Sequence, residues 1–378
     1  MNASLKVKAA IEPTINSAPR VLSEICMTQA VAAKDDGRQR GLLVFTTAMT
    51  THESSDCVVA AAMRNEGPFI VEWVAWYRML GFRIIVATND CTDHSPALLD
   101  ALQDAGWVKH IKHTPRPDLP PKISAHRVLH DSDTVRRADW VLVCDVDEFL
   151  VLHATDTIQG LLAALPSPFL GVAFSWKTFG IGGWQRYQPG LTHRQFKRCG
   201  LSNLLVNRPF KSLYRYPTVF RRMGAHTPHE FSGDWAAPEN AWITADGRPL
   251  PRFAQADAHP IRFLAQDEIS HETAQMNHYV LRSAEHFDMK RGTPSASAFK
   301  DRYTDDFFKR RNRNGMVDQS ALRFTDQFDA IHAQAMALPD VQRLHHLCGA
   351  DYVARLAAHQ GKDHRSDPRW QFHMESAG

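Results

Sequence analysis

The sequence predicts an α/β protein in which helices cover both faces of a mostly parallel sheet. Short apolar runs rich in β-branched residues alternate with longer amphipathic segments between residues 57 and 176, and this order is typical of strand–helix–strand units. The chain has 378 residues, of which 44% are hydrophobic and 22% charged. That length and composition suit a globular protein with a sizeable core.

The first strand and helix follow from local signals. Cys57–Met63 is an apolar run and predicts a buried strand. Pro68 opens a helix, because proline is tolerated in the first helical turn, and Gly81 ends it. Apolar residues recur between them at helical spacing and give the helix one apolar face: Ile70, Trp73, Val74, Tyr77 and Leu80.

The alternation continues along the next hundred residues. The same rules predict strands over Arg83–Ala87, Trp107–His113, Trp140–Cys144 and Gly171–Trp176, with helices from Ser95, over Ile123–Ala138 and over Thr157–Leu165. After Phe179 the pattern loosens into short strands and loops, which predicts an irregular α+β extension.

The central strand leads into a cluster of acidic residues. In the run Trp140–Leu150, WVLVCDVDEFL, the strand ends at Asp145, Asp147 and Glu148. Carboxylates this close raise one another's pKa unless a cation neutralises them. Asp145 and Asp147 are two residues apart, so both can leave the strand on one side and bind a hard divalent cation. The alternative is a solvated acidic turn, but core residues flank the cluster on both sides.

Polar clusters follow three of the predicted strands. Arg64–Glu66, Asn89–Asp93 and Asp145–Glu148 each come directly after a strand. In parallel sheets, ligands bind beyond the carboxyl ends of the strands, so we expect these clusters to meet at one edge. The alternative is that loops are polar in any case.

Composition excludes several classes of protein. The net charge of +3 gives no electrostatic reason to expect nucleic-acid binding. No secretory signal and no long apolar run is evident, so we expect a cytoplasmic protein. The cysteines form no CxxC pair and are expected to be free thiols: Cys26, Cys57, Cys91, Cys144, Cys199 and Cys348.

Several short motifs, taken in order, carry a family resemblance. They are Arg64-Asn65-Glu66, Glu72-Trp73 with Tyr77, Asn89-Asp90 with Asp93, Asp145-Val146-Asp147-Glu148-Phe149, Trp176–Gly180, Lys211-Ser212, His226–His229 and Asn277-His278-Tyr279. Together they resemble the family-2-like glycosyltransferases of the GT-A fold, in particular the branch that includes family-92-type enzymes. The resemblance implies that residues 54–295 form a GT-A glycosyltransferase domain. We expect a partly disordered N-terminal extension before it, over residues 1–53, and a helical C-terminal region with a polar tail after it, over residues 296–378.

The resemblance implies a nucleotide-sugar donor and a divalent metal, Mn²⁺ or Mg²⁺. The metal would bridge the diphosphate to Asp145 and Asp147, with Asp147 counted among the catalytic residues. Lys211 would reach the diphosphate; alternatively it is a surface lysine. The base and ribose would lie against residues after the first two strands: Arg64, Asn65, Glu66, Asn89, Asp90 and Asp93. After the second strand the family often has Asn-x-Ser-x-Asp, whereas this chain has Asn89-Asp90-Cys91-Thr92-Asp93. The choice between Asn89 and Asp90 as the donor-binding residue therefore stays open.

Other roles have several candidates. A histidine is expected to complete the metal site, with His226 or His229 ahead of His278, although each alone is more often structural. A carboxylate must take the acceptor's proton during an inverting transfer; Glu230 and Asp234 are candidates, or else solvated loop residues. Trp176 and Phe179 either form a wall for a sugar ring or belong to the core.

The sequence therefore predicts a metal-dependent glycosyltransferase, acting on a glycan or a lipid-linked acceptor. Two alternatives stay open: a sugar nucleotidyltransferase, whose glycine-rich loop is missing after the first strand, and a catalytically silent nucleotide- or carbohydrate-binding protein. The basic run Lys309–Arg313 is either a solvated face or a peripheral contact with an anionic membrane, which would be the inner face.

Overall fold

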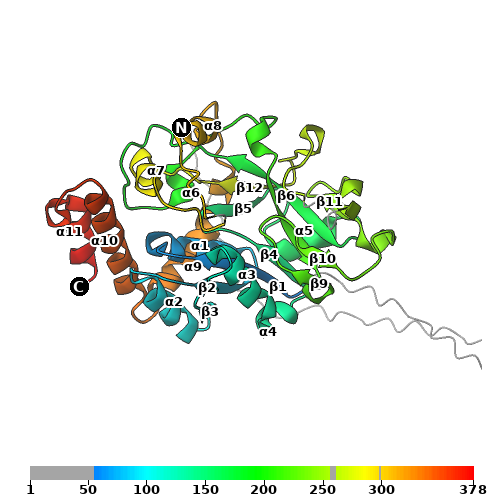
Figure 1. Ribbon diagram of the computed structural model, residues 1–378, viewed down its shortest axis with the longest axis horizontal. Coiled ribbons are helices and arrows are strands. Elements are labelled where there is room, and N and C mark those ends of the chain that lie inside the picture. Colours follow the sequence, from blue (N-terminus) through cyan, green and yellow to red (C-terminus); the bar gives the residue numbers. More distant parts are fainter. Residues whose placement is uncertain (1–54, 256–260, 298) are drawn as a thin grey trace, which may run out of the picture. The chain divides into compact units, whose positions relative to one another are not determined.

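A computed structural model describes residues 55–255, 261–297 and 299–378 (Figure 1). The predicted N-terminal extension over residues 1–53 lies outside the described residues. Residues 55–378 belong to one compact unit. The structure confirms the α/β class and the alternation of strands and helices that the sequence predicts.

A nine-stranded mixed sheet organises the molecule. Its strands follow the order β3-β2-β1-β4-β8-β6-β12-β5, with β11 paired to β6. The half around β1 is parallel, whereas β8 runs antiparallel to both β4 and β6, and β5 antiparallel to β12. The strands are β1 Cys57–Met63, β2 Arg83–Thr88, β3 Lys109–Lys112, β4 Trp140–Val143, β5 Glu148–Leu152, β6 Gly171–Thr178, β8 Phe210–Arg215, β11 Trp242–Thr244 and β12 Ala274–His278.

Both faces of the sheet are covered, because alternate residues of the central strands enter two separate cores. On β1, Val59 and Ala61 join one core with helix α1 (Gly67–Met79), while Val58 and Ala60 join the other with α3 (Pro121–Asp131). The remaining helices are α2 Ser95–Asp104, α4 Asp133–Arg136, α5 Ile158–Ala164, α6 Thr192–Gln195, α7 Ala284–Lys290, α8 Asp305–Arg311, α9 Thr325–Met336, α10 Val341–His359 and α11 Pro368–Ser376.

Helix α1 differs from its prediction. It is buried from Gly67 to Tyr77 and not along one face alone. Its one carboxylate, Glu72, is 3% exposed and accepts hydrogen bonds from the backbone N–H groups of Thr192 and His193, at 2.9 and 3.0 Å. Burial opposes the charge of Glu72, but the hydrogen bonds and the His193 ring outweigh it and lower its pKa. A tertiary contact therefore hides a residue that the periodicity places on a polar face.

The predicted helix over Ile123–Ala138 is also wrong in part, because the chain breaks it at Ser132. The Ser132 backbone is extended, and its hydroxyl accepts a hydrogen bond from the Val135 backbone N–H and so caps α4. Short elements complete the unit: strands β7 Arg198–Cys199, β9 Phe220–Arg222, β10 His229–Phe231 and β13 Met316–Val317, and 3₁₀ turns η2 Leu205–Asn207, η3 Pro217–Val219, η4 Pro238–Asn240, η5 Pro251–Gln255, η6 Gln266–Glu268, η7 Ser320–Phe324 and η8 His364–Ser366.

The predicted polar tail ends in a packed helix. Helix α11 lies against α10, coloured red and orange in Figure 1. Arg369 is 8% exposed and forms an ion pair with Glu285 at 2.6 Å, which ties the C-terminus to α7. Among the described residues, no helix is long and apolar enough to cross a membrane.

We expect His373 on α11 to make the stability of the protein depend on pH. Burial, and to a lesser extent His346, lowers the pKa of His373 to about 4. An unfolded histidine titrates near pH 6.5, so the unfolded state takes up a proton first as the pH falls, and stability is lost below that value. In urea titrations, His373→Gln should lose about 2 kcal/mol less between pH 7 and pH 5 than the wild type. The control His359→Gln, at an exposed position where Nε2 lies 3.4 Å from Asp288 Oδ2, should change this pH dependence far less.

Candidate functional site

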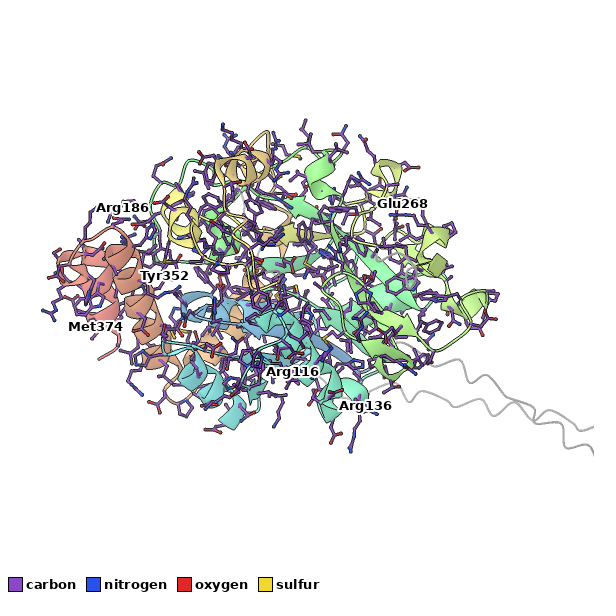
Figure 2. The ribbon with its side chains drawn as sticks, viewed as in Figure 1. Arg116, Arg136, Arg186, Glu268, Tyr352 and Met374 are labelled. Carbon is purple, nitrogen blue, oxygen red and sulfur yellow. The ribbon has the colours of Figure 1, made fainter. Side chains whose placement is uncertain are left out.

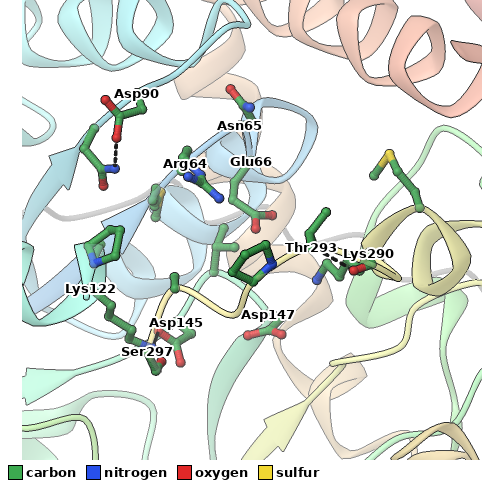
Figure 3. A pocket seen from close by; sticks show the side chains of 18 of the residues that line it. Arg64, Asn65, Glu66, Asp90, Lys122, Asp145, Asp147, Lys290, Thr293 and Ser297 are labelled. Carbon is green, nitrogen blue, oxygen red and sulfur yellow. Dashed lines mark hydrogen bonds and ion pairs between the residues drawn. The ribbon is translucent and has the colours of Figure 1, made fainter. Parts of the chain in front are cut away.

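The three polar clusters that follow β1, β2 and β4 meet at one cavity, as the sequence predicts. The strands end at the same edge of the sheet: Met63 pairs with Thr88, and Val143 pairs with Ala60. The cavity has a volume of about 460 Å³ (Figure 3). Its lining from these clusters is Arg64, Asn65, Glu66, Asn89, Asp90, Thr92, Asp145, Val146 and Asp147.

Residues of left-handed backbone conformation shape the rim. Asn65 has a φ of 57° and Asp90 a φ of 46°, a region in which Asn and Asp are common among non-glycine residues. Asn65 Oδ1 accepts a hydrogen bond from the Thr92 backbone N–H at 2.8 Å, and Asn65 Nδ2 donates to Thr92 Oγ1 at 3.2 Å. These bonds fix the loops after β1 and β2 together, so the backbone at this edge is preorganised.

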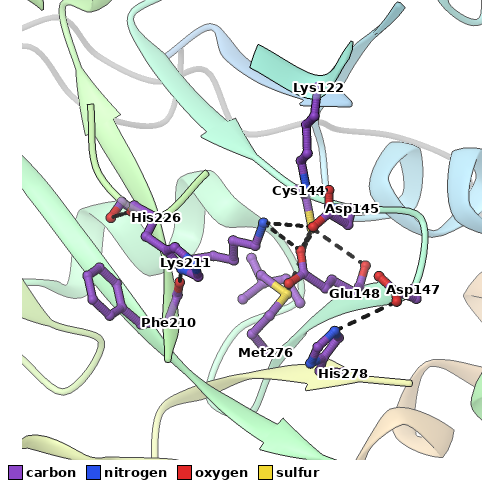
Figure 4. A network of polar contacts seen from close by, with 12 residues as sticks. Lys122, Cys144, Asp145, Asp147, Glu148, Phe210, Lys211, His226, Met276 and His278 are labelled. Carbon is purple, nitrogen blue, oxygen red and sulfur yellow. Dashed lines mark hydrogen bonds and ion pairs between the residues drawn. The ribbon is translucent and has the colours of Figure 1, made fainter. Parts of the chain in front are cut away.

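Two lysines neutralise Asp145, the first carboxylate of the sequence Asp145-Val146-Asp147, which we call the DVD motif and whose backbone we call the DVD turn. Lys122 forms an ion pair with Asp145 on one side, and Lys211 Nζ lies 3.4 Å from Asp145 Oδ2 on the other (Figure 4). Burial favours the neutral form of Asp145, but the charges of Lys122 and Lys211 outweigh it and hold its pKa well below the usual range. Asp145 is therefore an anion whose charge the protein itself already balances.

A buried ion pair lies beneath this carboxylate. Lys211 Nζ is 2.8 Å from Glu148 Oε2, and the two side chains are 1% and 0% exposed. Glu148 Oε2 also accepts a hydrogen bond from the Asp145 backbone N–H at 2.8 Å. Burial raises the pKa of Glu148. Lys211 is therefore not a surface lysine, and it does not line the cavity either. From the core, it positions the turn that carries Asp145 and Glu148.

The second carboxylate faces a histidine. Asp147 Oδ2 lies 3.7 Å from His278 Nε2, at the end of β12. Burial opposes ionisation of Asp147, but the proximity of His278 outweighs it and lowers the Asp147 pKa. Asp147 and His278 are thus a carboxylate and an imidazole close enough to bind the same cation, while the other ring nitrogen, His278 Nδ1, is buried without a hydrogen-bond partner.

The larger metal-ligand set is not assembled. His226 Nδ1 lies 2.7 Å from the Phe210 carbonyl, and Figure 4 shows Lys211 between His226 and the two aspartates. His229 begins strand β10. Within the ranges that the structure describes, no group of three or more His, Cys, Asp or Glu side chains is placed to hold a metal. The structure thus brings His278 next to Asp147, and not the two histidines that the sequence ranks first.

The other predicted site residues lie apart from the cavity. Glu230 forms an ion pair with Arg222 at 2.7 Å, and Asp234 accepts a hydrogen bond from the Ala236 backbone N–H at 2.8 Å; neither lines the cavity. Asp93 accepts hydrogen bonds from the backbone N–H and hydroxyl of Ser95 at 3.0 and 2.8 Å, a local turn just before α2. Phe179 is 1% exposed and packs on Tyr279 in the core.

Trp176 lies closer to the metal-binding candidates. Its ring packs on the His278 ring at a tilt of 39° with centroids 3.9 Å apart, and the Arg311 guanidinium lies 5.2 Å from its ring centroid. Burial, followed by the charges of Arg302 and Arg310, lowers the pKa of Arg311 to about 10. Arg311 is thus a partly buried cation beside the site, whereas its basic run predicts a solvated face.

Sequence reasoning also missed residues that complete the cavity. Lys122 is the second residue of α3, after a proline-rich loop, and its position next to a proline carries no functional signal. Arg355 and Tyr352 come from α10, and Arg355 Nη1 donates to the Asn65 carbonyl at 3.1 Å. Residues late in the chain that line the cavity include His286, Met289, Lys290, Thr293, Arg302, Tyr303, Arg355 and Tyr352, which is labelled in Figure 2. The helical C-terminal region therefore contributes to the same site as the first strands.

Comparison with known proteins gives weak structural overlaps. No family model and no curated protein matches the sequence. Residues 1–349 of TarS from S. aureus overlap at a TM-score of 0.32 and 13% identity, over 85% of this chain and 90% of that one. Glucosyl-3-phosphoglycerate synthase from Mycobacterium tuberculosis with Mn²⁺, UDP and phosphoglyceric acid gives 0.26 and 12%, over 45% and 58%. An active-site mutant of LgtC gives 0.27 and 12%, over 77% and 99%. At these TM-scores the function has to be inferred from the site itself.

Proposed function

We propose that this protein transfers a glycosyl group from a nucleotide-diphosphate sugar to a hydroxyl acceptor. The observation that carries the proposal is the meeting of three clusters, Arg64–Glu66, Asn89–Asp90 and Asp145–Asp147, at one cavity beyond the strand ends. In sheets of this kind, nucleotides bind at this edge. The order of motifs that resembles GT-A glycosyltransferases, including the family-92-like branch, supports the same activity.

The donor would lie in the cavity with its diphosphate toward the DVD turn. Lys122, Lys290 and Arg302 line that cavity and supply positive charge from three different segments. Such cations stabilise negative charge as it develops on a leaving diphosphate. Asn65, Glu66 and Asp90 would face the nucleoside, with Glu66 oriented by Arg282, whose Nη1 lies 3.3 Å from Glu66 Oε2.

Asp147 and His278 would hold Mn²⁺ or Mg²⁺. Such an ion, when bound, neutralises phosphate oxygens as a Lewis acid. The chain's own contribution is to keep Asp147 ionised and to orient His278 through the Trp176 ring. Asp145 would act through its charge and its position between two lysines, and not as the principal ligand.

We further propose that the transfer inverts the anomeric centre of the sugar and needs a carboxylate base. The acceptor is proposed to be a glycan or a lipid-linked glycan. Glu230 and Asp234 remain the sequence candidates for the base, although neither lines the cavity. The variants Glu230→Gln and Asp234→Asn test this. If one of these residues is the base, its replacement should lower the rate of transfer by about a hundredfold or more and leave donor binding unchanged.

A nucleotide-binding protein without catalysis is the second candidate. It is favoured because neither Glu230 nor Asp234 is among the residues that line the cavity. Such a protein would bind a nucleotide sugar in the cavity but would neither transfer nor hydrolyse the sugar with any acceptor supplied. Product analysis of donor incubated with acceptor mixtures separates the two functions.

Thermal-shift screening of the purified protein tests the proposed donor. UDP, GDP, CDP and their sugars are each added with Mn²⁺, with Mg²⁺ and with EDTA. A ligand that binds only the folded state raises the melting temperature, so one nucleotide family should stabilise the protein, and EDTA should remove the effect. No shift with any of these ligands would contradict a nucleotide-diphosphate donor site of this kind.

A further inference from the structure

An exposed surface beside the site combines unpaired arginines with apolar side chains. We define the basic–apolar surface as Leu201, Leu205 and Val317 together with Arg198, Arg310 and Arg313. Leu205 is 63% exposed, Val317 53% and Leu201 51%. Large hydrophobic side chains that are this exposed are few among the described residues. Exposed apolar groups that gather in one place mark interaction sites.

The chain holds this surface in place from three segments. Strand β7 pairs with β13, which sets Arg198 opposite Val317. Asn207 is 0% exposed, and its Nδ2 donates to the Leu201 carbonyl at 2.9 Å, which orders the loop that carries both leucines. A Cβ placed on Gly200 would lie 3.2 Å from the Arg313 Cβ, so the arginine stem packs directly against that loop.

The three arginines have no acidic partner among the described residues. Arg198 donates to the Asn314 carbonyl, Arg313 to the Arg310 carbonyl, and Arg310 to the Asp306 carbonyl, at 3.5, 2.9 and 3.3 Å. No carboxylate within the described ranges forms an ion pair with any of them. Their positive charge is therefore available to an anionic partner.

We propose that this surface docks the protein on an anionic lipid bilayer. Leucine and valine side chains enter the interface between headgroups and acyl chains, and surrounding arginines bind anionic headgroups. The arrangement suits shallow insertion, because the apolar side chains are few and Arg198 lies opposite Val317 in the same surface. The end of helix α8 and the residues after it link the surface to the site, since Arg310 and Arg313 lie on either side of Arg311, whose guanidinium is 5.2 Å from the Trp176 ring centroid. The docking does not depend on the proposed transfer activity.

Vesicle co-sedimentation with the full chain tests the proposal. The wild type should bind vesicles that contain about a third phosphatidylglycerol, and should not bind pure phosphatidylcholine. R198Q/R310Q/R313Q should weaken binding about tenfold or more, because each basic residue near the surface contributes to the attraction. The matched control R127Q/R136Q/R137Q removes the same charge from exposed arginines on and beside α3 and α4, and should bind as the wild type does.

The apolar half is tested separately. L201S/L205S should weaken binding several-fold at unchanged charge, while Ile123→Ser, at a 42% exposed position on α3, should not. Melting temperatures and thermal shifts with nucleotides report whether each variant is folded. The proposal is overturned if the wild type does not bind anionic vesicles, if both arginine triples lose binding equally, or if heparin binds while vesicles do not. The last result would point to a soluble acidic partner.

Discussion

Asp147→Asn is expected to abolish metal-dependent binding of the nucleotide diphosphate and to reduce glycosyl transfer by about a hundredfold or more. The substitution keeps the shape of the side chain but removes the charge that faces His278 at 3.7 Å. A neutral amide binds a hard divalent cation far less strongly than a carboxylate does. Titration calorimetry with the nucleotide that stabilises the wild type, with and without Mn²⁺, measures the loss.

Two variants make this result specific. His278→Ala should also lose the metal dependence, because it removes the other proposed ligand. Asp118→Asn changes an exposed carboxylate paired with Arg116 and should bind as the wild type does. If Asp147→Asn keeps wild-type affinity and the same response to EDTA, then the metal does not bind at this carboxylate.

Lys211→Met is expected to lower the free energy of unfolding by about 3–5 kcal/mol. Lys211 is the cation next to Glu148, which is 0% exposed and has one further oxygen, Oε1, without any partner. Removing the lysine leaves a buried carboxylate that must either stay charged without a counter-ion or take up a proton. Urea-induced unfolding at pH 7 measures the effect.

The partner variant separates charge from packing. Adding Glu148→Gln to Lys211→Met removes both charges, so the double variant should recover part of the lost stability. Lys112→Met changes an exposed lysine paired with Asp100 and should alter stability by less than about 1 kcal/mol. A loss for Lys211→Met no larger than for Lys112→Met would show that the pair in the core contributes little.

The sequence by itself determined the alternation of the first half. The strand over Cys57–Met63 and the helix that Pro68 opens were predicted within about a residue, because periodicity, proline and glycine are local signals. The meeting of the three polar clusters was also predictable, since parallel strands share a carboxyl edge. What strand order cannot reveal is which distant residues complete that edge.

Only the tertiary structure decided the surroundings of the two aspartates. It set Lys122 and Lys211 on Asp145, and it set His278 beside Asp147 by pairing β12 antiparallel to β5, with His278 opposite Glu148. Candidate histidines cannot be ranked as metal ligands from the sequence alone, because contacts across a sheet join residues far apart in the chain. The same holds for Arg311, whose basic run predicts a solvated face although the fold lays its guanidinium over Trp176.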